Sequence, residues 1–129
     1  MSEKSHRILI VDDDDDNRSN LSDILCDVGY ETETACDGQV ALEKFGTDCS
    51  RDECRFDVCL LDFKMPGMDG VELLQEIQEK NPNLRAIMIT AYAGEDGVER
   101  AIAAGSWKVM RKPVDIAALL GVIGEAVTN

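Results

Sequence analysis

The chain has 129 residues, 44% of them hydrophobic, with a formal net charge of −13. This length suits one domain, and the hydrophobic content excludes a disordered acidic chain. The charge disfavours direct DNA or RNA binding, because it would repel phosphate backbones. No apolar run is long enough to span a bilayer, and the first residues lack the apolar core of a signal peptide. We therefore expect a cytoplasmic protein that binds neither nucleic acid nor membrane directly.

Apolar runs and helical patterns alternate along the whole chain. Short β-branched runs predict strands, and apolar residues at helical spacing predict helices. The predicted strands, in chain order, are Arg7–Val11, Tyr30–Ala35 near the sheet edge, Phe56–Leu61, Leu84–Ile89 and Trp107–Met110. Five helices are predicted. The first carries Leu21 to Val28 and ends at Gly29, and the second covers Gln39–Phe45. The third carries Val71 to Ile77 and ends before Pro82, the fourth carries Val98 to Ile102 and ends at Gly105, and the fifth carries Ile116 to Ile123 after a cap at Asp115.

This order is a strand–helix pair repeated five times. It predicts an α/β fold of the (βα)5 class, a doubly wound sheet of five parallel strands with helices on both faces. We expect residues 1–129 to form a single domain. The charged segment Gly46–Arg55 is predicted to be a surface loop, which is either a partner epitope or a tolerated insertion.

Five consecutive aspartates follow the first strand, in the stretch VDDDDDN from Val11 to Asn17. Asp12 and Asp13 come directly after the strand. The next three fall at the entry to the first helix, where negative charge interacts favourably with the helix dipole and one aspartate can cap the helix. We therefore interpret Asp12 and Asp13 as site residues and the other three as helix-start residues.

Functional groups in such sheets gather beyond the carboxyl ends of the strands. Besides the two aspartates after the first strand, Asp62, Thr90 and Lys112 follow the third, fourth and fifth strands. Clustered carboxylates bind a hard divalent cation through oxygen, and Mg²⁺ fits best. A carboxylate is also a nucleophile toward phosphoryl groups, whose oxygens a lysine and a threonine would bind. The strand ends therefore predict a site that makes and holds an acyl phosphate.

Four stretches, ILIVDD, LLDFKMPGMDG, MITA and RKP, occur in that order. With them the chain strongly resembles the receiver domain of two-component response regulators over nearly its whole length. The resemblance implies the flavodoxin-like strand order 2-1-3-4-5. It also implies that Asp62 is the phosphoacceptor. Mg²⁺, with Mn²⁺ as a substitute, would be held by Asp13, Asp62, the backbone carbonyl of Lys64 and, through water, Asp12.

The same resemblance implies roles for the remaining strand ends. Thr90 would hydrogen-bond the phosphoryl group and report its arrival, Lys112 would pair with it, and the Lys112–Pro113 bond would be cis. The donor would be a phosphohistidine on a sensor histidine kinase or a histidine phosphotransfer protein. The chain would not be an enzyme apart from its own phosphorylation and dephosphorylation. The sequence does not identify the downstream protein that would bind the phosphorylated chain. A phosphorylation-dependent dimer is the alternative to such a partner.

The chain departs from this family at Val109, where many receivers carry an aromatic residue that moves with the threonine. Trp107 lies two residues earlier, so strand alternation predicts that it shares a face with Val109. We expect Trp107 to cover part of that surface. Thr90, Trp107 and Val109 are thus the candidate switch and partner residues.

Other protein classes fit less well. An EF-hand would need glycine where Asn17 stands and glutamate where Asp23 stands. A flavin carrier would need a phosphate-binding loop after the first strand, where this chain has carboxylates. A phosphoester hydrolase and an unphosphorylated interaction module on the same fold remain as alternatives. A redox or zinc role for the loop cysteines Cys49 and Cys54 has little support, because closed zinc sites take four ligands and the chain has one histidine.

Overall fold

The computed structural model describes residues 6–48, 56–62, 70–80, 84–90, 99–100, 102–112 and 114–128. Within these residues, the strands are β1 (Arg7–Val11), β2 (Glu31–Ala35), β3 (Val58–Asp62), β4 (Arg85–Thr90) and β5 (Lys108–Arg111). The helices are α1 (Asp15–Val28), α2 (Gly38–Asp48), α3 (Gly70–Lys80) and α5 (Ile116–Thr128). All strand pairs are parallel, and the order is β2-β1-β3-β4-β5. The predicted fold class and strand order are confirmed.

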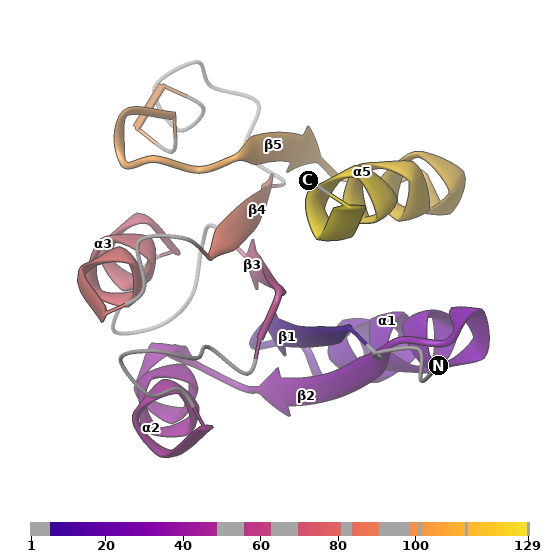
Figure 1. Ribbon diagram of the computed structural model, residues 1–129, viewed down its shortest axis with the longest axis horizontal. Coiled ribbons are helices and arrows are strands. Elements are labelled where there is room, and N and C mark those ends of the chain that lie inside the picture. The colour runs from indigo at the N-terminus through magenta and orange to yellow at the C-terminus, as the bar shows by residue number, and fades with distance from the viewer. Residues whose placement is uncertain are drawn as a thin grey trace.

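Helices cover both faces of the sheet. Figure 1 shows α2 and α3 on one face and α1 and α5 on the other. Because side chains alternate along a strand, β1 sends Leu9 and Val11 into the core under α2 and α3, and Ile8 and Ile10 into the core under α1 and α5. All five residues of β3 are buried, as expected of a central parallel strand. The sheet therefore stands between two separate hydrophobic cores.

Local hydrogen bonds explain where α1 begins and ends and where α5 begins. Asp14 is the N-cap, and its side chain accepts a hydrogen bond from the backbone N–H of Asn17 at 3.1 Å. Gly29 ends the helix with φ of 116°, a left-handed conformation that glycine adopts without steric cost. Asp115 similarly accepts a bond from the N–H of Ala117 at 3.0 Å at the start of α5. The predicted caps are confirmed.

Four strands differ from their predicted bounds by one or two residues, and one helix ends later than predicted. The helix predicted over Gln39–Phe45 continues to Asp48, so the first residues of the predicted loop Gly46–Arg55 are helical. A glycine inside a helix weakens it without ending it when the turns on either side are maintained. Residues 49–55, with Cys49 and Cys54, lie outside the described residues. Between β4 and β5, residues 99, 100, 102 and 103 are helical, and Ile102 is 60% exposed.

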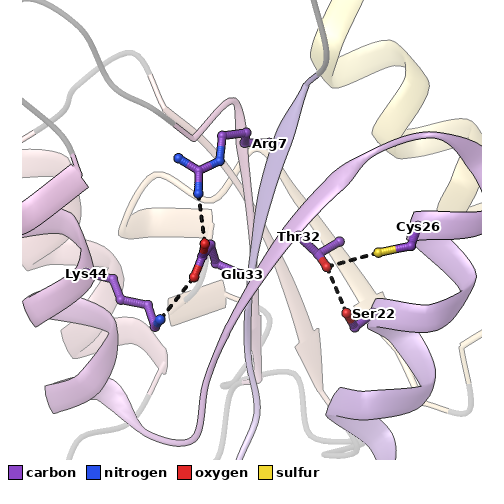
Figure 2. Close-up of polar contacts among 6 residues, drawn as sticks. All are labelled: Arg7, Ser22, Cys26, Thr32, Glu33 and Lys44. Atoms are coloured by element: carbon purple, nitrogen blue, oxygen red, sulfur yellow. Dashed lines mark hydrogen bonds and ion pairs between the residues drawn. The ribbon is translucent and has the colours of Figure 1, made fainter.

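Side chains of β2 make polar contacts on both faces of the sheet. Toward α2, Glu33 accepts hydrogen bonds from Arg7 at 2.9 Å and Lys44 at 3.1 Å. Toward α1, the hydroxyl of Thr32 lies 2.8 Å from the hydroxyl of Ser22 and 3.4 Å from the thiol of Cys26 (Figure 2). The strand order confirms the predicted position of this strand at the sheet edge.

Replacing Gly105 by alanine is expected to lower the free energy of unfolding by about 1–2 kcal/mol. Gly105 has φ of 102°, and an added Cβ would lie 2.7 Å from Oε1 of Gln78, whose Nε2 donates to the Gly105 carbonyl. The matched control is Gly121→Ala in α5, where an added Cβ would meet no described residue within 4 Å apart from its own helix backbone and chain neighbours. A gain of about 0.5–1 kcal/mol in the free energy of unfolding is expected there from helix propensity. Urea unfolding measures both, and equal shifts would contradict the assignment of strain to Gly105.

Candidate functional site

Three carboxylates meet at the carboxyl end of the sheet. Asp12 and Asp13 follow β1, and Asp62 is the last residue of the adjacent strand β3. One carboxylate oxygen from each lies within 4.8 Å of the others. Asp12 is 4% exposed and Asp62 7%, whereas Asp13 is exposed. Parallel pairing of β1 with β3 brings these residues together, although about fifty positions separate them in the chain.

A lysine and a threonine complete the same edge. Nζ of Lys112 lies 3.4 Å from Oδ1 of Asp62, which makes an ion pair. The backbone N–H of Lys112 donates to the carbonyl oxygen of Thr90 at 2.8 Å. Thr90 ends β4 and is only 2% exposed. The structure thus collects Asp12, Asp13, Asp62, Thr90 and Lys112 at the ends of neighbouring strands.

The first turn of α1 contributes two residues that sequence reasoning missed. The side-chain amide of Asn17 donates to Oδ2 of Asp12 at 2.7 Å, and the backbone N–H of Asp14 donates to Oδ1 of Asp12 at 2.9 Å. Arg18 donates to the backbone carbonyl of Asp12 at 2.7 Å and pairs with Asp15. The signal for them in the sequence is an amide and a guanidinium that directly follow the acidic run.

The acidic run divides as predicted. Asp14 caps α1, and Asp15 and Asp16 lie in its first turn, where the helix dipole favours negative charge. These residues do not belong to the group of three whose oxygens converge. Their predicted assignment to the helix start is confirmed.

The predicted relation between Trp107 and Val109 is wrong. Val109 packs against the core under α2 and α3, and Trp107 packs against the core under α1 and α5. Alternation holds only within a strand, and β5 begins at Lys108, so a bend at Trp107 breaks the period. The indole ring instead lies near two cations, with the guanidinium carbon of Arg85 at 5.2 Å and Nζ of Lys108 at 5.7 Å from its centroid. Trp107 therefore does not cover the surface of Val109.

Two other predicted site features, the carbonyl of Lys64 and the cis bond before Pro113, fall outside the described residues.

The three converging carboxylates have the ligand chemistry that Mg²⁺ requires. A hard cation takes oxygen ligands, and three carboxylates from two strands supply them at one place. Their mutual repulsion is only partly offset by Lys112, which pairs with Asp62. The donor set fits Mg²⁺, with Asp12, Asp13 and Asp62 as the residues that could hold it.

Among the described residues, no helix is both long and apolar enough to cross a membrane. The fold and the site together define a doubly wound α/β protein with an acidic site and an associated lysine at the carboxyl ends of its strands. The family model of the response regulator receiver domain matches residues 8–124. The chain belongs to this family, whose members are receivers of two-component systems and bind Mg²⁺ at an aspartate cluster.

Individual relatives agree with this assignment. The chain is 40% identical to a response regulator receiver protein of Anaeromyxobacter sp. over 88% of its own length and 45% of that protein. It is 36% identical to sporulation initiation phosphotransferase F of Bacillus subtilis over 87% of its length and 86% of that protein. A CheY-like receiver from Methanospirillum hungatei superimposes with a TM-score of 0.87 at 34% identity, covering 97% and 95% of the two chains. The chain spans less than half the length of the first curated relatives it matches.

Proposed function

We propose that this chain is a phosphoacceptor that takes a phosphoryl group onto Asp62 in a Mg²⁺-dependent reaction. The observation that carries the proposal is the convergence of Asp12, Asp13 and Asp62 within 4.8 Å, with Lys112 beside the last of them. A single carboxylate at a strand end would have many explanations. Three such groups and a lysine, drawn from three strands of a receiver fold, support phosphoryl transfer.

In the proposed reaction, a carboxylate oxygen of Asp62 attacks the phosphorus of a phosphohistidine. The new O–P bond forms as the P–N bond breaks, and the imidazole leaves with the bonding electron pair and takes up a proton. Asp13, Asp62, the backbone carbonyl of Lys64 and, through water, Asp12 would hold Mg²⁺, which would supply neutralisation of the charge on the transferring oxygens. The ammonium group of Lys112 moves from the Asp62 carboxylate to a phosphoryl oxygen, and the Thr90 hydroxyl donates to another.

We propose that residues 1–129 form one receiver domain without enzymatic activity toward other molecules. Receivers of this family interact with histidine kinases or phosphotransfer proteins. For this chain we propose such a protein as donor, and a downstream protein or a phosphorylation-dependent dimer as the reader, with Thr90, Trp107 and Val109 as the residues that change. The cytoplasmic location stays a prediction.

The proposal is tested by incubating the chain with Mg²⁺ and acetyl phosphate and measuring its intact mass. We expect a gain of one phosphoryl group that is removed by hydroxylamine, which cleaves acyl phosphates. Chelation of Mg²⁺ with EDTA before the donor is added should prevent the gain. An unchanged mass in Mg²⁺, with a known receiver phosphorylated in parallel, would overturn the proposed function.

A further inference from the structure

We propose that Asn17 is a positioning residue for the acidic site. Its side-chain amide holds Asp12 in the orientation that favours a bound divalent cation. This inference rests on the proposed function and adds to it a residue that touches neither the cation nor the phosphoryl group. Asn17 would act entirely through Asp12.

The contacts of Asp12 carry the first step. Its Oδ2 accepts from Nδ2 of Asn17 at 2.7 Å, and its Oδ1 accepts from the backbone N–H of Asp14 at 2.9 Å. The side chain is held at both oxygens in a place where the residue is 4% exposed. Without these donors, the buried carboxylate would lose the two hydrogen bonds that fix its orientation. The amide of Asn17 therefore limits the rotation of the Asp12 carboxylate and keeps it close to the carboxylates of Asp13 and Asp62.

The charge of the donors carries the second step. The two donors that the described residues offer to the Asp12 carboxylate are neutral amides, so they orient it without neutralising its negative charge. Arg18, the cation in the same turn of α1, bonds instead to the backbone carbonyl of Asp12 at 2.7 Å and to the carboxylate of Asp15. A cationic side chain in place of Asn17 would compete with a metal ion for the same charge. An amide is suited to positioning a carboxylate that serves a cation.

The placement of Asn17 carries the third step. Its backbone lies in the first turn of α1, where its N–H donates to the capping side chain of Asp14 at 3.1 Å. Its side chain returns from the helix to the end of β1. The helix start and the acidic site are thus joined by a short chain of hydrogen bonds. Partners of metal ligands commonly affect affinity by about 10- to 100-fold, and we expect the lower end because Asp12 also keeps its bond to Asp14.

The direct test is a calorimetric titration of Asn17→Ala with Mg²⁺ in the absence of any phosphodonor. We expect the dissociation constant to rise about tenfold. The matched control is Asn20→Ala, which removes another amide from α1. Asn20 is exposed, and it lines a cavity of about 610 Å³ together with Asn17 and Lys112. The control should bind Mg²⁺ like the unaltered chain. Asn17→Ser is a second truncation with the same expected loss, for use if the alanine variant folds poorly.

A second readout separates positioning from a helix role. Alanine has a higher helix propensity than asparagine, so a residue that served only α1 would leave Mg²⁺ affinity unchanged and stability in EDTA equal or slightly raised. That result would overturn the inference. A positioning role predicts that the phosphorylation rate of Asn17→Ala reaches the value of the unaltered chain at saturating Mg²⁺. If the unaltered chain itself binds no Mg²⁺, the proposed function fails and the inference with it.

Discussion

Asp62→Asn is expected to abolish the Mg²⁺-dependent gain of a phosphoryl group, with a rate at least about 10³-fold below that of the unaltered chain. Asparagine has nearly the shape of aspartate and leaves the packing at the end of β3 intact, where Asp62 is 7% exposed. It lacks the anionic oxygen that attacks phosphorus. It also removes the negative charge with which Lys112 makes an ion pair at 3.4 Å. Intact-mass analysis after incubation with acetyl phosphate measures the loss.

The matched control is Asp16→Asn, which removes the same charge from the same acidic end of the molecule. Asp16 is exposed in the first turn of α1 and is not among the carboxylates that converge. Its replacement should leave phosphorylation within about twofold, since it acts only through screened long-range charge. A phosphoryl group that persists in Asp62→Asn, mapped to another aspartate such as Asp13, would show that the acceptor is wrongly assigned.

Leu60→Ala is expected to lower the free energy of unfolding by about 3–4 kcal/mol. Leu60 is 1% exposed in β3, the central strand, and belongs to the core under α1 and α5. Alanine there removes buried apolar surface and leaves a cavity that strands on both sides cannot close, because their backbones are fixed by the sheet. Urea unfolding, monitored by circular dichroism, measures the change.

Ile102→Ala provides the comparison for this loss. It removes a large aliphatic side chain that is 60% exposed, and we expect a change within about 0.5 kcal/mol. The two variants together distinguish burial from residue type. Equal losses in both would contradict the assignment of Leu60 to a tightly packed core.

Periodicity in the sequence was sufficient to predict most of the fold. Runs such as Arg7–Val11 are apolar on both faces, and only a sheet covered on both sides accommodates them. The strand order rested on the family resemblance and not on periodicity. The end of α2 is not predicted correctly, because the charged segment that begins at Gly46 is typical of a surface loop, whereas α2 continues to Asp48. Among the described residues, the glycines that end helices, Gly29 and Gly105, have positive φ. A sequence does not reveal which conformation a glycine adopts.

The site was predictable where it follows from strand ends, and unpredictable where it depends on side-chain direction. Asp12, Asp13, Asp62, Thr90 and Lys112 lie at one edge because parallel strands share their carboxyl ends. The face of Trp107 depended on whether the strand began before or after it, a one-residue difference that reverses the side of the sheet. The bond from Asn17 to Asp12 depended on a rotamer, which no periodicity encodes.

The polar contacts of β2 have a consequence for how copies of this chain meet at high concentration. An unprotected edge strand is a template on which another chain can add a strand, the first step toward aggregates. In β2 the charged group around Glu33 and the hydroxyl pair of Thr32 occupy opposite faces, so an added apolar strand would find no matching surface on either side (Figure 2). These polar contacts therefore disfavour extension of the sheet through β2.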